Sequence, residues 1–75
     1  MGNSTYVIIP AYNEALRIGR VLEGAKTYSK NIVVVDDGSD DNTMEVAKKH
    51  GVTVLRHLIN LGKGAALKTG CDFAY

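Results

Sequence analysis

Two adjacent carboxylates follow an apolar run in this chain, and they are the residues best placed to do chemistry. Val33 to Val35 are three β-branched residues, and Asp36 and Asp37 come directly after them. A run this apolar predicts a buried strand of a parallel sheet, so the carboxylates mark the point where the strand leaves the core. Open α/β sheets bind their ligands at that end of the strands. Two acceptor side chains there suit a ligand with N–H or O–H donors, or a metal ion.

Helix capping is the plain alternative for these carboxylates, because an aspartate often begins the helix that follows a strand. Ser39 and Asp41 already offer such a cap, so the two carboxylates before them exceed what capping needs. We therefore favour ligand binding at Asp36 and Asp37. An aspartate that accepts a hydrogen bond from the ring N–H of a pyrimidine or guanine discriminates among bases.

A second polar segment, Pro-Ala-Tyr-Asn-Glu, lies between Pro10 and Glu14. Tyr12 suits contact with a planar base or a ribose, and Glu14 can accept a hydrogen bond. The plain alternative is a turn with a packing aromatic ring and a helix cap. Taken alone the segment fits that alternative better, but it opens at the same predicted sheet edge as the carboxylates.

A third segment, Asn60 to Gly64, places Lys63 between two glycines at the start of a predicted helix. Backbone N–H groups, the positive end of the helix dipole and one ammonium group make an anion site. A flexible turn with a solvated lysine is an equally good alternative. Two better-known phosphate loops are excluded: Gly64 stands where a Walker loop needs Ser or Thr, and Leu67 stands where a dinucleotide fingerprint needs Gly or Ala.

Three apolar, strand-like runs alternate with three helical patterns along the chain. The strands are expected over residues 5–9, 31–35 and 52–56, with Pro10 ending the first. The order β-α-β-α-β-α calls for a parallel sheet with right-handed crossovers. The expected fold class is therefore α/β, with three layers, and the loops after all three strands open at one sheet edge.

The expected helices have recognisable caps and stripes. Asn13 is expected to cap the first helix, and Ser39 or Asp41 the second, which runs to about His50. The expected buried stripe of the third helix consists of Ala65, Ala66, Thr69 and Phe73.

Length and composition restrict the class of protein. Seventy-five residues allow one small domain, and the single cysteine, Cys71, cannot form an internal disulfide and is expected to be a buried structural thiol. A net charge of +1 without a basic, aromatic stripe argues against nucleic-acid binding. There is no apolar run of membrane-spanning length and no signal-peptide pattern, so a cytoplasmic location is expected. The sequence indicates no role for His50 or His57.

The last predicted helix reaches Tyr75, the end of the sequence. A three-stranded parallel sheet needs both faces covered and leaves two apolar edges. We therefore expect residues 1–75 to be a single partial domain, the front piece of a larger one.

In their order and spacing, the three segments resemble the start of a family 2 glycosyltransferase with the GT-A fold. The matching stretches are residues 7–14, 33–43 and 60–66, and the resemblance covers roughly residues 4–75. It is closest to the branch that transfers sugars to polyprenyl or dolichyl phosphate, such as dolichyl-phosphate mannosyltransferase. The resemblance implies a Rossmann-like front half that binds a UDP- or GDP-sugar for transfer to a lipid phosphate or a saccharide.

The resemblance also carries over individual residues as nucleotide contacts. Asp37 is expected to contact the base, and Gly62 and Lys63 to form the turn beside the nucleotide. Gly38, Ser39, Asp41 and Thr43 are expected to form a structural helix start. The full set of expected nucleotide contacts is Pro10, Ala11, Tyr12, Glu14, Asp36, Asp37, Gly62 and Lys63.

The sequence departs from the family pattern in one respect: the metal-binding Asp-x-Asp motif does not occur in it. A divalent metal, Mg or Mn, is expected for the full-length enzyme, whereas no metal ligand and no catalytic residue is expected in this segment. The parent enzyme is expected at the cytoplasmic face of a membrane. Without a Lewis acid for the diphosphate leaving group, the 75-residue chain is expected not to transfer sugar.

Two other classes of protein compete with this interpretation. One is an oligomerising α/β module without useful ligand affinity, whose copies pair through the open strand at residues 5–9. The other is a receiver-type signalling domain, which needs a further aspartate after the third strand. Residues 57–60 contain none, so the receiver interpretation is unfavourable.

Overall fold

Six elements alternate along the chain in the predicted order. The computed structural model describes residues 5–75. The strands form one parallel sheet in the order β1-β2-β3. The predicted α/β fold, with a parallel sheet that alternates with helices, is therefore confirmed. The elements are β1 (Val7–Ala11), α1 (Ile18–Ala25), β2 (Ile32–Asp37), α2 (Thr43–Lys48), β3 (Thr53–His57) and α3 (Lys63–Ala74).

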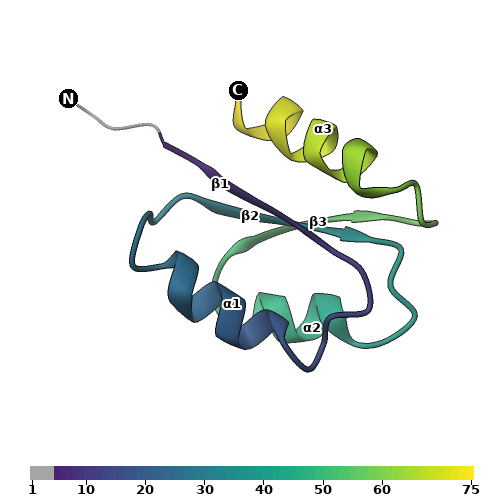
Figure 1. Cartoon of the computed structure of the whole chain (residues 1–75), viewed down its shortest axis with the longest axis horizontal. Coiled ribbons are helices and arrows are strands. Elements are labelled where there is room, and N and C mark those ends of the chain that lie inside the picture. Colours follow the sequence, from purple (N-terminus) through teal and green to yellow (C-terminus); the bar gives the residue numbers. More distant parts are fainter. Residues whose placement is uncertain (1–4) are drawn as a thin grey trace.

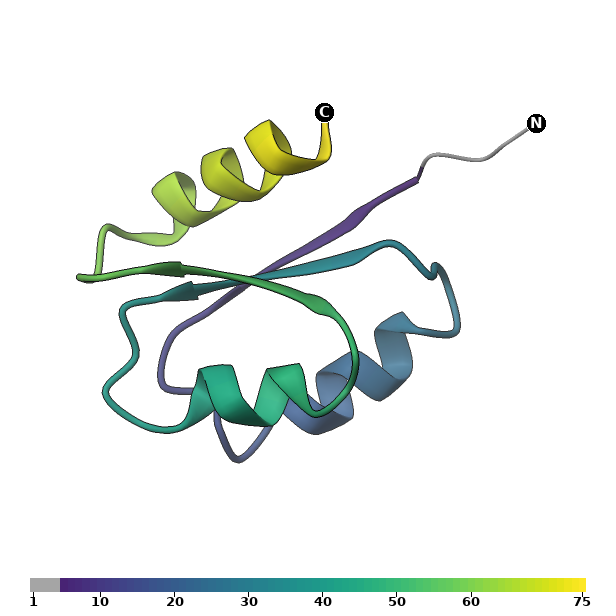
Figure 2. The ribbon, with the colours of Figure 1, turned by 180° about the vertical axis from the view of Figure 1, so that it is seen from behind.

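Helices cover both faces of the sheet. α1 and α2 lie on one face and α3 on the other (Figures 1 and 2). β2 is the central strand, and all of its residues are buried. Because side chains alternate along a strand, Ile32 and Val34 pack towards α1 and α2, whereas Val33 and Val35 pack towards α3. The same alternation directs the two aspartates at the end of β2 to opposite faces.

α3 approaches the sheet closely at Gly70. A Cβ atom there would stand 2.4 Å from Cγ2 of Ile8 and 3.2 Å from Cγ2 of Val35. Any side chain would push the helix away, so glycine permits this approach. The last turn is held by an edge-to-face contact between the rings of Tyr6 and Tyr75, whose centroids are 5.6 Å apart. These contacts fix the position of α3 above β1 and β2.

The first strand runs through Pro10 to Ala11, so the prediction that Pro10 ends it is wrong. The N–H of Val7 donates to the carbonyl of Asn31 on the β2 side at 2.8 Å. Since the direction of the amide alternates along a strand, the nitrogen of Pro10 faces the open edge of the sheet. Proline is tolerated there because no partner needs its N–H.

The other two strands also extend beyond the apolar runs that predicted them. β2 includes Asp36 and Asp37, and β3 ends with His57. In the parallel register, Asp36 pairs with Arg56 and Asp37 with His57. The ladder continues because these polar side chains find partners beside the sheet, which an apolar pattern does not reveal.

α1 begins later than expected, and Asn13 does not cap it. The helix starts at Ile18, after a turn in which the N–H of Ile18 donates to the carbonyl of Glu14. Asn13 has a φ of 52°, and its side chain accepts a hydrogen bond from the amide of Asp40. The cap residue expected for α1 therefore connects two loops.

α2 is shorter than expected and ends at Lys48, before His50. Of the two candidate caps, Asp41 accepts a hydrogen bond from the N–H of Thr43 at 3.0 Å. The hydroxyl of Ser39 accepts from a more distant part of the chain, described below. The N-cap position of α2 is Asn42, which makes no side-chain cap hydrogen bond, so the prediction that Ser39 or Asp41 caps this helix is wrong.

In α3, Ala66 and Gly70 are buried, but Phe73 is 55 % exposed and Cys71 is exposed. The predictions of a buried Phe73 and a buried thiol are both wrong. α3 packs mainly over β1 and β2, and its flank towards β3 meets the end of that strand at Thr69. Phe73 lies one turn further along the same flank, and Cys71 faces away from the sheet.

Among residues 5–75, no helix combines the length and apolar character that crossing a bilayer requires.

Candidate functional site

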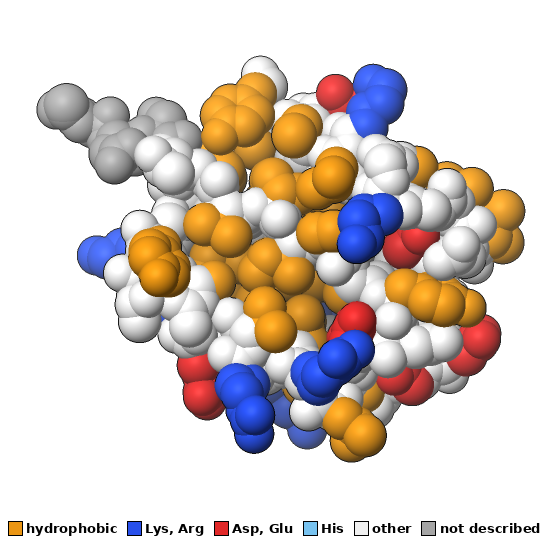
Figure 3. Space-filling model, in the orientation of Figure 1, with side chains coloured by type: hydrophobic (Ala, Val, Ile, Leu, Met, Phe, Trp, Pro, Cys, Tyr) orange, Lys and Arg blue, Asp and Glu red, His pale blue; other side chains and the backbone are white. Residues whose placement is uncertain are grey.

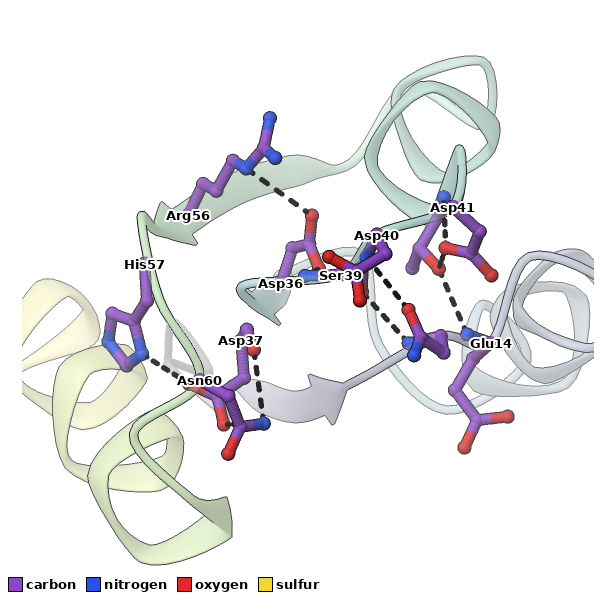
Figure 4. A network of polar contacts seen from close by, with 11 residues as sticks. Glu14, Asp36, Asp37, Ser39, Asp40, Asp41, Arg56, His57 and Asn60 are labelled. Carbon is purple, nitrogen blue, oxygen red and sulfur yellow. Dashed lines mark hydrogen bonds and ion pairs between the residues drawn. The ribbon is translucent and has the colours of Figure 1, made fainter.

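The three strands end at one edge of the sheet, and the segments that follow them meet there. We refer to residues 12–17 as loop 1, 38–42 as loop 2 and 58–62 as loop 3. Loop 2 lies between the other two because β2 is the central strand. Figure 4 shows the polar contacts through which loop 2 and the end of β2 hold both neighbours.

Asp37 binds loop 3 and the end of β3 with both oxygens of its carboxylate. Oδ1 accepts from the N–H of Leu61 at 2.9 Å and lies 2.7 Å from Nδ1 of His57. Oδ2 accepts from the N–H of Gly62 at 2.8 Å and from the side-chain amide of Asn60 at 3.0 Å. A carboxylate offers about four lone-pair positions, so the acceptor capacity of Asp37 is used within the chain.

The same donors keep Asp37 ionised. The N–H of Leu61 and the imidazole of His57 hold the pKa of the Asp37 carboxyl below its ordinary value of 3.8, although burial opposes them. Only 3 % of the residue is exposed. One buried charge thus binds the last three residues of loop 3, residues 60–62.

Asp36 lies on the opposite face of the sheet and has fewer partners. Its Oδ1 accepts from the N–H of Ser39 at 3.2 Å, and its Oδ2 lies 3.9 Å from Nε of Arg56. The residue is 1 % exposed. Asp36 therefore shapes the turn into loop 2 and does not face the space between the loops.

Loop 3 lies directly on Gly38, which follows the two aspartates. A Cβ atom at Gly38 would stand 2.5 Å from the carbonyl carbon of Ile59 and 2.6 Å from the nitrogen of Asn60. Its φ of 73° also lies in the region that favours glycine. The close approach of the two backbones therefore requires glycine at this position.

Loop 1 is held by the side chains of loop 2 and the first residue of α2. Its amides are left without helical partners by the late start of α1, and they find side-chain acceptors instead. In return, Oδ1 of Asn13 accepts from the N–H of Asp40 at 2.8 Å. The three amide contacts are Asn13 to Oγ of Ser39 (2.9 Å), Glu14 to Oγ1 of Thr43 (2.9 Å) and Ala15 to Oδ2 of Asp41 (3.2 Å).

Asp41 is the charged member of this second set of contacts. The hydroxyl of Thr43 holds the pKa of the Asp41 carboxyl below 3.8, against the effect of burial and with help from the backbone N–H groups of Thr43 and Ala15. The residue expected to begin a helix therefore also binds loop 1.

A cavity of about 380 Å³ lies between loop 1 and loop 3. Tyr12 gives it an aromatic wall, and Lys63 stands beside it at the N-terminus of α3, where the helix dipole favours anions. Asn60, which the sequence did not single out, also lines it. Seven of the eight predicted contacts line the cavity: Pro10, Ala11, Tyr12, Glu14, Asp37, Gly62 and Lys63. The eighth, Asp36, does not.

The carboxylates of this site do not fit a divalent cation. The acceptor positions of Asp37 are used by four donors, and Asp36 is buried on the other face. In the described part of the chain, no three His, Cys, Asp or Glu side chains converge on one point. We therefore derive no chemistry through a metal from these residues.

Sequence reasoning missed two residues that bind the carboxylate of Asp37, His57 and Asn60, and the partner of His57, Thr69. His57 was given no role, and Thr69 was expected only as part of a buried stripe. A signal was available for His57: extending the third strand by one residue places it opposite Asp37. The roles of Asn60 and Thr69 depend on the path of loop 3, which has no local signature.

Comparison with known proteins agrees with the resemblance of the loops. Residues 6–75 match the family described as glycosyl transferase family 2. An uncharacterized protein of Methanocaldococcus jannaschii is 56% identical over 70 residues, which cover 92% of this chain and 29% of that protein. No solved structure gives a significant match.

Two further relatives have names that state an activity. The dolichyl-phosphate beta-glucosyltransferase of Drosophila melanogaster is 39% identical over 82 residues, covering 85% of this chain and 25% of the relative. The UDP-N-acetylglucosamine--dolichyl-phosphate N-acetylglucosaminyltransferase of Methanococcus voltae is 35% identical over 88 residues, covering 93% of this chain and 35% of the relative. The chain thus spans between a quarter and about a third of the length of these relatives.

The family match includes all three strands, all three helices and both sides of the cavity. The similarity to the dolichyl-phosphate branch, which the loop segments predicted, is supported by the two named relatives. The chain therefore belongs to glycosyl transferase family 2.

Proposed function

We propose that this chain is the nucleotide-binding part of a glycosyltransferase that takes its sugar from a UDP- or GDP-sugar donor. The observation that carries the proposal is the cavity between loops 1 and 3, where residues far apart in the sequence converge. In this proposal the acceptor of the whole enzyme is a lipid phosphate such as dolichyl or polyprenyl phosphate. The names of the two relatives support that acceptor.

The cavity offers each part of a nucleoside diphosphate a suitable surface. The ring of Tyr12 can lie against a base or ribose, because it is 44% exposed on the cavity wall. Lys63 and the N-terminus of α3 suit the diphosphate. Asp37 remains the proposed base acceptor. To accept from a base, it must release one of its present donors. The side chain of Asn60 is suited to this because it is exposed, whereas the imidazole of His57 is also held by Thr69.

In the same proposal, this segment binds the donor but does not catalyse transfer. Residues 1–75 are then one partial domain of a longer enzyme at the cytoplasmic face of a membrane, which needs Mg or Mn. Incubation of the chain with labelled GDP-mannose or UDP-glucose, Mn²⁺ and polyprenyl phosphate should therefore give no product above the blank. Clear turnover would contradict this part of the proposal.

Calorimetric titration with UDP and GDP tests the binding proposal directly. We expect one of the two to bind with a dissociation constant of about 1 mM or below, which corresponds to ~4 kcal/mol of binding free energy. Lys63→Ala and Tyr12→Ala should both weaken that binding. Lys68→Ala is the matched control, because Lys68 lies on the same helix and pairs with Asp72 away from the cavity. If neither UDP nor GDP binds, the proposal is wrong.

Self-association is a second candidate function, favoured by the open edge of β1. A groove of about 260 Å³ runs between this edge and α1. Figure 3 shows hydrophobic side chains gathered across the middle of the face where β1 lies. The groove is lined by Ile9, Pro10, Ala11, Glu14, Arg17, Ile18 and Val21.

Light scattering separates this candidate from nucleotide binding. A dimer that Val21→Glu dissociates, and that does not respond to UDP or GDP, would support a structural module. Val21 is suited to the test because it lines the groove and is 47% exposed. A monomer that binds nucleotide would support the first proposal.

A further inference from the structure

His57 is bound at both nitrogens of its ring. Nδ1 lies 2.7 Å from Oδ1 of Asp37, and Nε2 lies 2.8 Å from Oγ1 of Thr69. The side chain is only 11% exposed. The imidazole therefore connects the end of β2, the end of β3 and α3, three elements that meet below loop 3.

The chemistry of the two partners fixes the orientation of the ring. An ionised Asp37 can only accept, so the hydrogen of the neutral imidazole is on Nδ1. Nε2 then accepts from the hydroxyl of Thr69, and in a protonated ring it donates to the same oxygen. Because a hydroxyl can donate or accept, Thr69 satisfies His57 in either state.

The oriented ring fixes the carboxylate in turn. The oxygen that faces His57 also accepts from the N–H of Leu61, and the second oxygen accepts from the N–H of Gly62. We propose that His57 is a positioning residue of the nucleotide cavity: braced by Thr69, it holds Asp37 in the orientation that places Gly62 and Lys63 on the cavity wall. This inference rests on the proposed function of the cavity.

A direct catalytic role for His57 is the alternative, since carboxylate, imidazole and hydroxyl stand in the order of a hydrolase triad. In such a triad the hydroxyl must be open to the substrate. Here Thr69 lies between the buried Ala66 and Gly70 on the sheet side of α3, and neither Thr69 nor His57 lines the cavity. His57 therefore acts through Asp37 and not on a substrate.

Graded variants test the inference. His57→Phe keeps a ring but removes both hydrogen bonds, whereas His57→Asn retains an amide near the position of Nδ1 and can still donate to Asp37. Thr69→Val removes only the brace, and Thr69→Ser retains the hydroxyl. His50→Asn is the matched control, because His50 follows α2 at the opposite end of the sheet and packs near Gly19.

Two measurements are made on each variant: hydrogen exchange of the Leu61 and Gly62 amides, and calorimetric titration with UDP and GDP. We expect His57→Phe to speed exchange of both amides and weaken nucleotide binding by about tenfold or more, the scale seen when outer partners of metal ligands are removed. Thr69→Val should do the same to a smaller extent. His57→Asn and Thr69→Ser should recover part of the loss, and His50→Asn should change neither quantity.

A merely structural role would speed exchange throughout the sheet, including the amide of Val34 on β2, without an effect confined to loop 3. That result, or unchanged exchange and affinity in His57→Phe, would overturn the inference. If His57→Phe does not fold, Thr69→Val decides by the same criteria. If the wild-type chain binds neither nucleotide, the proposed function is wrong, and the exchange rates still decide whether His57 positions loop 3.

Discussion

Loop 2 and the residues that flank it, Asp37 and Thr43, hold loop 1 and loop 3 in different ways. Loop 3 is bound through one carboxylate, Asp37, which accepts from two backbone amides, an imidazole and a side-chain amide. Loop 1 is bound through three separate oxygens, each of which takes one amide. We call these the loop 3 contact and the loop 1 contact. The loop 3 contact depends on one side chain, so we expect a single substitution to break all of it. In the loop 1 contact, each substitution should remove one hydrogen bond and leave the others.

Burial does not separate the two contacts. Asp37 is 3% exposed, and Ser39 and Thr43 of the loop 1 contact are 4% and 0% exposed, whereas Asp41 is exposed. A lost hydrogen bond costs most where the orphaned group cannot turn to solvent. The number of donors that depend on one side chain, and not burial, therefore makes the loop 3 contact the more sensitive of the two.

Asp37→Asn should have the largest effect of the variants considered. An asparagine amide replaces one acceptor oxygen with a donor, so at least two of the four donors to Asp37 lose their partner. We expect a lower thermal unfolding midpoint, fast exchange of the Leu61 and Gly62 amides and no measurable nucleotide binding. Asp40→Asn is the control, because the Asp40 side chain is exposed and only its backbone N–H is used. Equal behaviour of the two variants would contradict the claim that the loop 3 contact depends on one side chain.

Acid should release the same contact. The pKa of Asp37 is lowered in the folded chain, so its stabilising contribution is complete above the unfolded value of 3.8 and is lost as the pH falls through the folded pKa. Unfolding curves recorded across this range should show the wild type losing stability, and Asp37→Asn should lose less of it. Asp41 also has a lowered pKa, so a residual acid dependence should remain in the variant.

Gly38→Ala should come next, because loop 3 lies on this residue. A left-handed conformation costs a non-glycine residue roughly 1–2 kcal/mol, and crowding against loop 3 should add about 1–3 kcal/mol. Gly51→Ala is a close control: its φ is 74°, but a Cβ atom there would meet no other part of the chain within 4 Å. Urea unfolding of both variants separates strain from crowding. If Gly51→Ala lowers the unfolding free energy as much as Gly38→Ala does, crowding against loop 3 adds nothing to the cost at Gly38.

The same comparison explains which parts of the structure the sequence could predict. Apolar runs such as Val33 to Val35 predict burial from their composition alone, so the order of elements and the parallel sheet could be predicted from them. The ends of the strands did not follow, since Asp36, Asp37 and His57 extend the ladder only because partners arrive from other elements. The predicted cap at Asn13 was wrong for the same reason.

For the candidate site, the loop motifs predicted the residues that line the cavity but not the residues behind them that hold Asp37 in place. Tyr12 and Lys63 belong to short segments with a recognisable pattern, and they line the cavity. His57 and Thr69 are separated in sequence and belong to no pattern, yet they meet at Asp37 through the fold. Contacts of this kind depend on how two elements pack and on the course of the loop between them. The spacing of residues within a short segment of sequence does not reveal them.

Ser39→Ala tests the claim that a substitution in the loop 1 contact removes one hydrogen bond and leaves the others. Its hydroxyl accepts from the N–H of Asn13, and removing that acceptor should cost about 1–2 kcal/mol of unfolding free energy, the usual scale for a lost cap. Asn42→Ala is the control, because Asn42 precedes α2 without a side-chain cap bond, and it should change stability by less than ~0.5 kcal/mol. Loop 3 amides should keep their protection in both variants. Loss of that protection in Ser39→Ala would show that the two contacts are not independent.

Asn13→Gly should have the smallest effect, because two changes oppose each other. The variant loses the bond from the N–H of Asp40 to Oδ1 of Asn13, worth about 0.5–1.5 kcal/mol. Glycine, however, relieves the cost of the φ of 52°. We expect a net loss of about 0.5–1 kcal/mol by urea unfolding. Asn13→Ala loses the same bond without that relief, so it should be less stable than Asn13→Gly by ~1 kcal/mol. Equal stabilities would mean that the backbone of loop 1 is set by the side chain of Asn13 and not by the three amide contacts.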